Sequence, residues 1–310
     1  MIVFFVQDYD MNIDELRNIC DDFFTIGNIA ILQQNTGNDV YDFYFRNYFD
    51  CQSVTSATDK PVLLHIGAIE DYAEIESLMK DLEMRLFVSE NDHKRCSDIE
   101  QWYPILKEHT PFTKVYDELP KLDELLQDFS FPFFLKGNRQ TNRHLKSKCI
   151  IENPEQYERI KVEWENDPIL FWQKPAIREY VPLQIIDSQS YPDMVPMSYE
   201  FRFFYFEGKC MSYGPYWYMG LSYSLSDKEL NEVLKLTDWA AMRTNNVFMA
   251  VDVAKTAAGE WIIVEINDAQ ESGFVGVNPF TLWKNTIDAV QNMTQLCIEE
   301  SFEDDDFCSG

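Results

Sequence analysis

Two carboxylates and an amide near the C-terminal end of the chain have the spacing of a metal site. Asp252 interrupts an apolar run at residues 247–254, and Glu265 and Asn267 belong to a second run at residues 260–267. Apolar runs of this kind, separated by a short polar turn, predict a β-hairpin. Side chains two residues apart share a strand face, so Glu265 and Asn267 point the same way and Asp252 can lie opposite them. These oxygen ligands suit Mg²⁺ that also binds nucleotide phosphates; the alternative is an amphipathic hairpin whose acidic face meets water.

A concentrated basic segment follows a predicted strand at residues 131–135. Lys136 ends that strand, and the polar loop after it contains four further cationic residues: Arg139, Arg143, Lys146 and Lys148. Lysine offers a point charge to phosphate oxygens, and arginine can bind them through two nitrogen atoms. The loop therefore indicates a polyphosphate site, with a solvated hairpin turn as the alternative.

Two arginines lie in apolar surroundings further along the chain. Arg178 precedes Glu179 in a short extended linker at residues 175–182. The free backbone groups of such a linker match the donor and acceptor edge of adenine, although a plain interdomain strand has the same pattern. Glu200 and Arg202 share a face of a predicted strand. This spacing favours either an arginine aimed at a phosphate or a cross-strand salt bridge on a solvated face.

The elements that must position these residues are of mixed type. Apolar periodicity near the N-terminus predicts strands at residues 2–7, 29–34 and 40–49, and a strand that runs into a glycine turn at residues 61–69. It also predicts helices at residues 11–24 and 69–87. This alternation indicates a small α/β domain, and we place its boundary near residue 112. Ser226 and Glu229 predict the capping box of a helix that ends near Thr244. The acidic stretch at residues 299–310 is expected to be frayed.

Composition excludes several classes of protein. The 310 residues carry a formal charge of −27, from 53 acidic and 26 basic side chains, and such a surface repels nucleic acid and anionic membranes. The seven cysteines are widely spaced with no CxxC motif, which favours reduced thiols in the cytoplasm. The N-terminal residues lack the pattern of a signal peptide, and no apolar run approaches the length of a membrane span. The four histidines show no metal-ligand spacing.

The order of these motifs resembles the ATP-grasp superfamily. The segments FPFFLKG, REYVPL, EFRFFYFEGK and VFMAVDV…WIIVEIND follow one another over residues 112–290. They are most similar to the clade named for one arginine and two lysines, and to eukaryotic cell-division-cycle ATP-grasp proteins that help to assemble translation initiation factor 2. The resemblance implies an α+β ATP-grasp fold, in which two α+β subdomains grip a nucleotide. It implies a small α/β pre-ATP domain at residues 1–111, an ATP-grasp domain at 112–298 and an acidic tail at 299–310.

The resemblance also implies roles for individual residues. Lys136 would contact the α- and β-phosphates, Arg178 would be the arginine of the clade, and Arg202 would face the γ-phosphate or an acyl-phosphate. These three are the expected catalytic residues. The remaining expected ligands are Lys146 or Lys148 as the second lysine, Glu179, Tyr180 and Val181 at the adenine hinge, and Asp252, Glu265 and Asn267 for Mg²⁺.

The activity implied by the resemblance is ATP·Mg-dependent ligation of a carboxylate to an amine through an acyl-phosphate. The expected acceptor is a peptide, a protein terminus or an amino acid, and the expected cofactors are ATP and Mg²⁺. Two alternatives remain open: an ATP-binding assembly factor for a protein partner without ligase turnover, and a kinase-like phosphate transfer. No nucleic-acid or membrane partner is expected, and the expected location is the cytoplasm.

Overall fold

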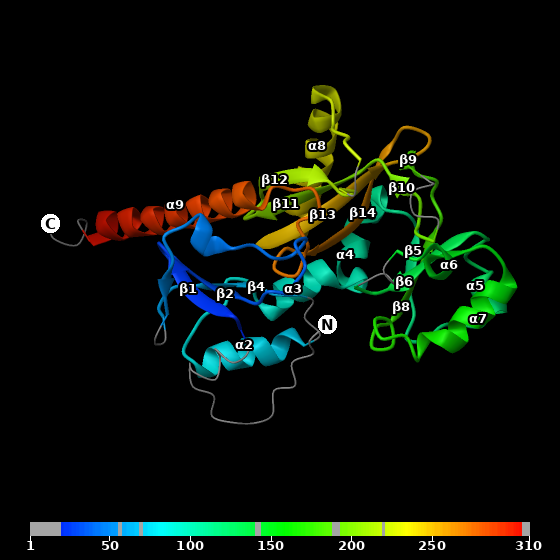
Figure 1. The fold of residues 1–310 in the computed structure, drawn as a ribbon, viewed down its shortest axis with the longest axis horizontal. Coiled ribbons are helices and arrows are strands. Elements are labelled where there is room, and N and C mark those ends of the chain that lie inside the picture. The colour runs from blue at the N-terminus through cyan, green and yellow to red at the C-terminus, as the bar shows by residue number, and fades with distance from the viewer. Residues whose placement is uncertain are drawn as a thin grey trace.

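The computed structural model describes residues 20–54, 58–67, 71–139, 144–187, 193–218 and 221–305, with side chains described as far as residue 293. Within these ranges, three four-stranded sheets and a two-stranded one organise the chain. The N-terminal sheet (blue) lies at one end of the molecule and the strands from the middle of the chain (green) at the other (Figure 1). The strand predicted at residues 2–7 lies outside the described residues.

The N-terminal sheet has the strand order β3-β1-β2-β4. It consists of β1 (Asp22–Ile26), β2 (Ile29–Gln33), β3 (Gln52–Ser53) and β4 (Val62–His65). β2 and β4 are parallel and buried along their whole length, so both predicted strands are confirmed. The helix α2 (Tyr72–Asp81) begins after Asp71, whose side chain accepts the backbone N–H groups of residues 73 and 74. This confirms a helix within residues 69–87.

The predicted helix at residues 11–24 is wrong at its C-terminal end. Phe23 and Phe24 belong to β1, where they pair antiparallel with Leu32 and Ile31. The apolar residues in this short run fit a helical and a strand pattern equally well, and pairing with β2 decides between them. The earlier part of this prediction, up to residue 19, lies outside the described residues.

The predicted strand at residues 40–49 is also wrong. The segment contains a 3₁₀ turn, η1 (Phe45–Asn47), in place of a strand. The carboxylate of Asp42 accepts the backbone N–H groups of residues 36 and 37, at 2.7 and 2.8 Å, and closes a loop. Phe43 and Phe45 then turn into the core with ring centroids 4.8 Å apart. The aromatic side chains are buried as a cluster rather than on one face of a strand.

The middle of the chain forms a sheet with the order β5-β8-β6-β7, whose pairs are all antiparallel. Its strands are β5 (Thr113–Val115), β6 (Phe133–Gly137), β7 (Ile150–Ile151) and β8 (Pro175–Glu179). Its helices are α5 (Leu122–Leu125), α6 (Lys146–Cys149) and α7 (Pro154–Trp164). Phe133, Tyr157 and Ile177 lie in the core of this unit. Lys136 lies inside β6, with its side chain directed away from that core toward the next sheet.

The third sheet has the order β12-β11-β13-β14 and carries the predicted metal-site hairpin. Its strands are β11 (Glu200–Phe206), β12 (Lys209–Pro215), β13 (Phe248–Lys255) and β14 (Trp261–Asp268). A two-stranded ribbon, β9 (Ile185–Asp187) with β10 (Met197–Ser198), precedes it. The hairpin prediction is therefore confirmed.

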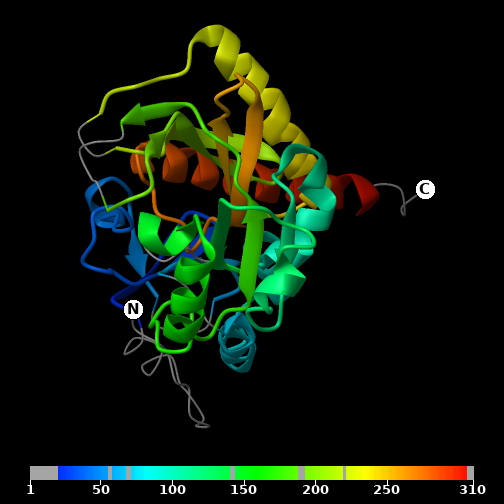
Figure 2. The same cartoon turned by 90° about the vertical axis from the view of Figure 1, so that its right-hand side faces the viewer.

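Helices cover both faces of the third sheet (Figures 1 and 2). α3 (Glu90–Ser97), α4 (Ile99–Leu106) and α8 (Asp227–Thr244) share one core with Phe201 and Phe203. α9 (Pro279–Asp305) and the N-terminal sheet share the other core with Phe204 and Phe206. Strand periodicity thus divides β11 between two cores. The capping box of Ser226 and Glu229 at the start of α8 is confirmed.

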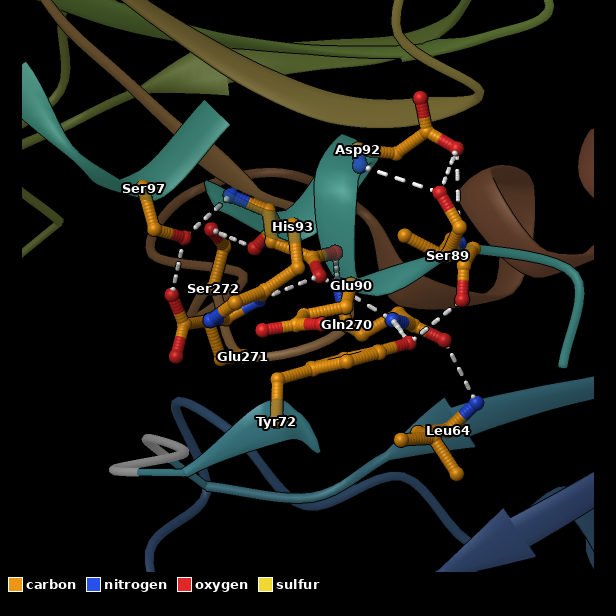
Figure 3. A network of polar contacts seen from close by, with 12 residues as sticks. Leu64, Tyr72, Ser89, Glu90, Asp92, His93, Ser97, Gln270, Glu271 and Ser272 are labelled. Carbon is orange, nitrogen blue, oxygen red and sulfur yellow. Dashed lines mark hydrogen bonds and ion pairs between the residues drawn. The ribbon is translucent and has the colours of Figure 1, made fainter. Parts of the chain in front are cut away.

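A polar network joins the N-terminal sheet to the end of β14 (Figure 3). The Gln270 side chain accepts the backbone N–H of Leu64 at 2.8 Å, and its amide donates to the Tyr72 hydroxyl at 3.0 Å. His93 on α3 lies 2.9 Å from the carboxylate of Asp268, with both side chains fully buried. These contacts fix Asp268, the last residue of β14, and Gln270 just after it to three elements, β4, α2 and α3, that precede them by more than 150 residues.

The chain ends in a helix that projects from the body of the molecule (Figure 1). α9 continues to Asp305, so residues 299–305 are helical rather than frayed, while residues 306–310 lie outside the described ranges. None of the helices in the described ranges combines the length and the apolar character needed to cross a bilayer.

Candidate active site

A cavity lies between the sheet that contains β6 and β8 and the sheet that contains β11, β13 and β14. Part of its wall is apolar, formed by Phe134, Ile150, Val181, Leu183, Ile262 and Val264. The rest is charged or polar and includes Lys136, His144, Arg178, Glu200, Asp252 and Glu265. This combination of an apolar wall with a few convergent polar groups is typical of a small-molecule site.

The register of the third sheet brings the charged residues together. Asp252 on β13 lies directly opposite Glu265 on β14 and directly opposite Arg202 on β11. The predicted pairing of Asp252 with Glu265 across the hairpin is therefore confirmed. Strand alternation places all three side chains on one face of the sheet. Asp252 and Glu265 line the cavity, whereas Arg202 and Asn267 lie behind them and are not part of its lining.

Asp252 and Arg202 form a buried bidentate ion pair. Nε and Nη2 of Arg202 donate to the two carboxylate oxygens of Asp252 at 2.7 and 2.6 Å, and Nη1 donates to the Gly273 carbonyl at 2.8 Å. Burial opposes the charge on Arg202, but Asp252 outweighs it and holds the pKa of the guanidinium above its ordinary value. Arg202 therefore has a cross-strand ion-pair partner, as one of the two alternatives expected, but the pair is buried rather than on a solvated face.

Glu265 and Lys136 form a second ion pair, which joins the two sheets across the cavity. The Lys136 ammonium, only 3% exposed, donates to Oε2 of Glu265, and Nδ2 of Asn267 donates to Oε1 at 2.8 Å. Burial raises the pKa of Glu265, but the charge and hydrogen bond of Lys136, aided by Asn267 and Arg202, hold it at about 2. Glu265 is therefore a carboxylate at neutral pH.

Arg178 is buried at the joint between the two sheets. Its Nε donates to the Thr113 hydroxyl at 3.0 Å, its Nη1 donates to the Val264 carbonyl, and its guanidinium lies over the Trp102 ring. Its Nη2 is buried without a hydrogen-bond partner among the described residues. Burial lowers the pKa of Arg178 to about 10, with Glu265 opposing the shift, so the side chain is charged at neutral pH. Within the part of the chain that the structure describes, Arg178 therefore offers a charged donor that the protein leaves unused.

The last residue of β8 and the two residues after it line the cavity, and their role as an adenine hinge stays a prediction. Glu179, Tyr180 and Val181 all contribute to the wall. The backbone N–H of Glu179 is used by the Phe112 carbonyl at 2.8 Å. Tyr180 and Val181 form no backbone–backbone hydrogen bond with another described residue, so their peptide groups are available to a ligand.

The basic loop contributes a different side chain from those expected. Lys146 is 46% exposed and lies 3.8 Å from Glu152, and Lys148 donates to Asp167 at 2.8 Å. Neither lysine lines the cavity, because residues 146–149 form a short helix that directs them elsewhere. Their role as the second lysine stays a prediction. Arg143 lies outside the described residues.

Three residues of the site were not assigned a role from the sequence: His144, Glu200 and Tyr216, all of which line the cavity. Burial and the neighbouring Asp252 raise the pKa of Glu200 to about 8, although a hydrogen bond from Ser198 opposes the shift. Glu200 could have been found, since it precedes Arg202 by two residues on the same strand face. His144 and Tyr216 left no comparable signal, because only the folded chain brings them together.

The oxygen ligands predicted for Mg²⁺ are present, but each carboxylate is already paired. Asp252 accepts from Arg202, and Glu265 accepts from Lys136 and Asn267. Among the described residues, no group of three or more His, Cys, Asp or Glu side chains forms a metal site. Two carboxylates and one amide fit a Mg²⁺ ion that completes its coordination with phosphates and water, rather than one enclosed by the protein alone.

Comparison with known proteins agrees with this geometry. A family model for an ATP-grasp domain, family 3 of the clade named for one arginine and two lysines, matches residues 130–286, just over half of the chain. The chain belongs to the ATP-grasp family. This ATP-grasp chain is also similar to solved structures, although no curated protein sequence matches it.

Two of those structures show the same fold. D-alanyl-alanine synthetase A from Vibrio cholerae is 13% identical with a TM-score of 0.53, over 81% of this chain and 78% of that one. D-alanine–D-alanine ligase from Bacillus anthracis, complexed with ATP, is 18% identical with a TM-score of 0.51, over 78% of this chain and 79% of that one. The α+β ATP-grasp fold predicted from the sequence is therefore confirmed.

Proposed function

We propose that this ATP-grasp protein binds ATP and Mg²⁺ in the cavity and ligates a carboxylate to an amine. The observation that carries the proposal is a cavity with one apolar wall and one charged wall, where Lys136 and Glu265 form an ion pair and Asp252 is paired with Arg202 behind it. Two cations and two carboxylates so close together provide both phosphate ligands and metal ligands. We infer that residues 1–111 form the pre-ATP domain and residues 112–298 the ATP-grasp domain.

The nucleotide would lie with its base against the apolar wall and its phosphates toward the charged residues. The unpaired peptide groups of Tyr180 and Val181 suit the donor and acceptor edge of adenine, beside Leu183 and Ile262. Lys136 and the unpartnered Nη2 of Arg178 then offer positive charge to phosphate oxygens. The carboxylic side chain of Glu200 and the Ser198 hydroxyl supply further polar contacts to the ligand.

The bound metal would be held by Asp252, Glu265 and Asn267. When bound, Mg²⁺ neutralises charge on phosphate oxygens. In the ligand-free protein, Lys136 and Arg202 form ion pairs with Glu265 and Asp252. These carboxylates can bind the metal only when phosphate oxygens replace them as the ion-pair partners of the two cations. We therefore expect ATP and Mg²⁺ to bind together.

The reaction requires no nucleophilic side chain from the protein. A substrate carboxylate oxygen attacks the γ-phosphorus of ATP, and the bond to the β–γ bridging oxygen breaks to release ADP. An amine then attacks the acyl carbon and loses a proton, and inorganic phosphate leaves. Lys136 and Arg202 stabilise the negative charge that develops at the transferring phosphate, and the two sheets exclude water around it. We infer a peptide, protein terminus or amino acid as the acceptor, in the cytoplasm.

The test is phosphate release from ATP and Mg²⁺ in the presence of pools of amino acids or peptides, with the products analysed by mass spectrometry. We expect release that requires both a carboxylate and an amine, and a product whose mass shows loss of water between them. A protein that ATP·Mg stabilises, but that releases no phosphate with any pool of amino acids or peptides, would favour the assembly-factor alternative. A phosphorylated product without an amide would instead indicate kinase-like transfer.

A further inference from the structure

The basic loop brings a histidine, rather than a lysine, to the charged part of the cavity. We propose that His144 is a nucleotide-contacting residue that donates a hydrogen bond from its ring Nδ1–H to the phosphate chain of ATP. The proposal rests on the proposed function, since it requires that the cavity holds a nucleotide. It assigns to His144 the contact that the sequence assigned to Lys146 or Lys148.

The backbone of His144 is held in an unusual conformation. Its φ is +57°, in the left-handed region that residues other than glycine seldom adopt. The backbone N–H of Val195 donates to the His144 carbonyl at 2.8 Å, and the N–H of Lys146 donates to the Asp193 carbonyl at 2.9 Å. The conformation that holds this residue at the cavity wall is energetically unfavourable, and such conformations concentrate at functional sites.

The ring of His144 is oriented by two aromatic side chains. Its Nε2 lies 3.3 Å from the Tyr216 hydroxyl, and its ring packs edge-on against Trp217 at 5.5 Å. Burial keeps the pKa of Tyr216 well above its ordinary value, so the phenol retains its proton and can donate it to Nε2. The phenol oxygen can also accept from Nε2, so the proposal includes the choice of tautomer: Tyr216 donates to Nε2, and the neutral ring carries its own proton on Nδ1. No described residue accepts a hydrogen bond from Nδ1, and the side chain lines the cavity.

The charged groups that act on His144 belong to the two ion pairs of the site. Burial lowers its pKa to about 4, Glu265 opposes the shift, and Lys136 and Arg202 add to it. Arg202 also lies over the Tyr216 ring at 5.1 Å. The ring is therefore neutral at pH 7, and it offers a hydrogen bond without adding charge to two balanced ion pairs. A lysine at this place would add a further cation beside Lys136 and Arg178.

The alternative is that His144 only packs against Trp217 and closes the cavity. The two roles differ in which part of the nucleotide they affect. A phosphate contact strengthens the binding of ATP and ADP but not of adenosine, which has no phosphate. A packing contact shapes the whole cavity and affects adenosine as well.

The experiment uses the full chain and the variant His144→Gly. Glycine removes the ring but adopts a left-handed backbone without strain, so the fold is retained. The control is His109→Ala, because His109 packs edge-on against Trp239 at 4.8 Å and does not line the cavity. Dissociation constants for adenosine, ADP and a non-hydrolysable ATP analogue, with Mg²⁺, are measured by titration calorimetry at pH 7.

We expect His144→Gly to weaken ADP and the ATP analogue about tenfold or more, since a tenfold change corresponds to about 1.4 kcal/mol. Its affinity for adenosine and the affinities of the control should match the wild type. Equal weakening of adenosine and the ATP analogue would overturn the proposal in favour of packing. Unchanged ATP affinity in His144→Gly would overturn it while leaving the proposed function intact, whereas a wild-type protein that binds no nucleotide would overturn both.

Discussion

The ion pair between Lys136 and Glu265 leads to a quantitative prediction about stability. In the ligand-free protein, the substitution Glu265→Gln removes the ion-pair partner of an ammonium group that is 3% exposed. Removing one partner of a buried ion pair costs about 3–5 kcal/mol, because the other charge remains buried. The lowered pKa of Glu265, which the charge and hydrogen bond of Lys136 cause, has the same sign: the folded protein stabilises the ionised carboxylate. We therefore expect a loss of about 3 kcal/mol at pH 7.

The stability that Glu265 contributes should depend on pH in a defined direction. The pKa of Glu265 is lowered by folding, so its contribution to stability is complete above pH 4.5 and is lost as the pH falls toward 2. The difference in unfolding free energy between the wild type and Glu265→Gln should therefore close over that range. Urea titrations at several pH values, followed by tryptophan fluorescence, measure it.

The control for this experiment is Glu232→Gln on the surface of α8. Glu232 lies 3.8 Å from Lys228 in an exposed pair, and such pairs contribute less than about 1 kcal/mol. A Glu265→Gln variant as stable at pH 7 as Glu232→Gln would refute the reasoning. So would a difference from the wild type that stays constant down to pH 2, because it would reflect packing rather than charge.

Three further predictions concern the ligand, the reaction and acid stability. With free ATP·Mg at 100 times its dissociation constant, the wild-type protein should gain about 2.7 kcal/mol of stability in a thermal scan. Lys136→Ala should lose that gain, and a gain equal to that of the wild type would contradict the role of Lys136 as a phosphate ligand. Arg202→Ala should slow phosphate release about 10²–10³-fold at saturating substrate, provided that circular dichroism shows a folded protein, and unchanged turnover would remove Arg202 from the transition state. Burial lowers the pKa of His65 to about 4, so folding keeps this histidine neutral and stability should fall as the pH drops from 6.5 to 4. His65→Gln should flatten that part of the urea-derived pH profile, and an unchanged slope would assign the loss to other groups.

Local periodicity predicted the part of the site that lies in one hairpin. Glu265 and Asn267 share a face because strand side chains alternate, and a short turn left few registers in which Asp252 could lie opposite them. Arg202 was recognised as a site residue, but the choice of Asp252 as its partner depends on the pairing of β11 with β13, which are far apart in the sequence. The spacing of residues in the sequence does not predict that β11 pairs with β13.

The incorrect predictions fall in segments whose structure is determined by contacts with residues distant in the sequence rather than by the local pattern. The aromatic residues at 40–49 alternate as in a strand, yet Phe43 and Phe45 are buried against side chains from α9 and the N-terminal sheet. The role of Lys146 or Lys148 as the second lysine stays a prediction, because charge alone does not determine which way a side chain in this loop points. His144 reached the cavity through a left-handed backbone held by residues 193–195.

The last helix has a consequence for how the protein is made. Leu282, Trp283 and Ile287 of α9 are buried in the same core as Phe24 and Phe45 of the N-terminal part, with the rings of Phe45 and Trp283 4.8 Å apart. Domains of a growing chain generally fold in the order in which they emerge from the ribosome. The face of the N-terminal sheet that contacts α9 departs from this order, because it can be covered only after α9 has been synthesised. Until then this apolar surface stays exposed on the growing polypeptide, and a chaperone that shields it would limit aggregation.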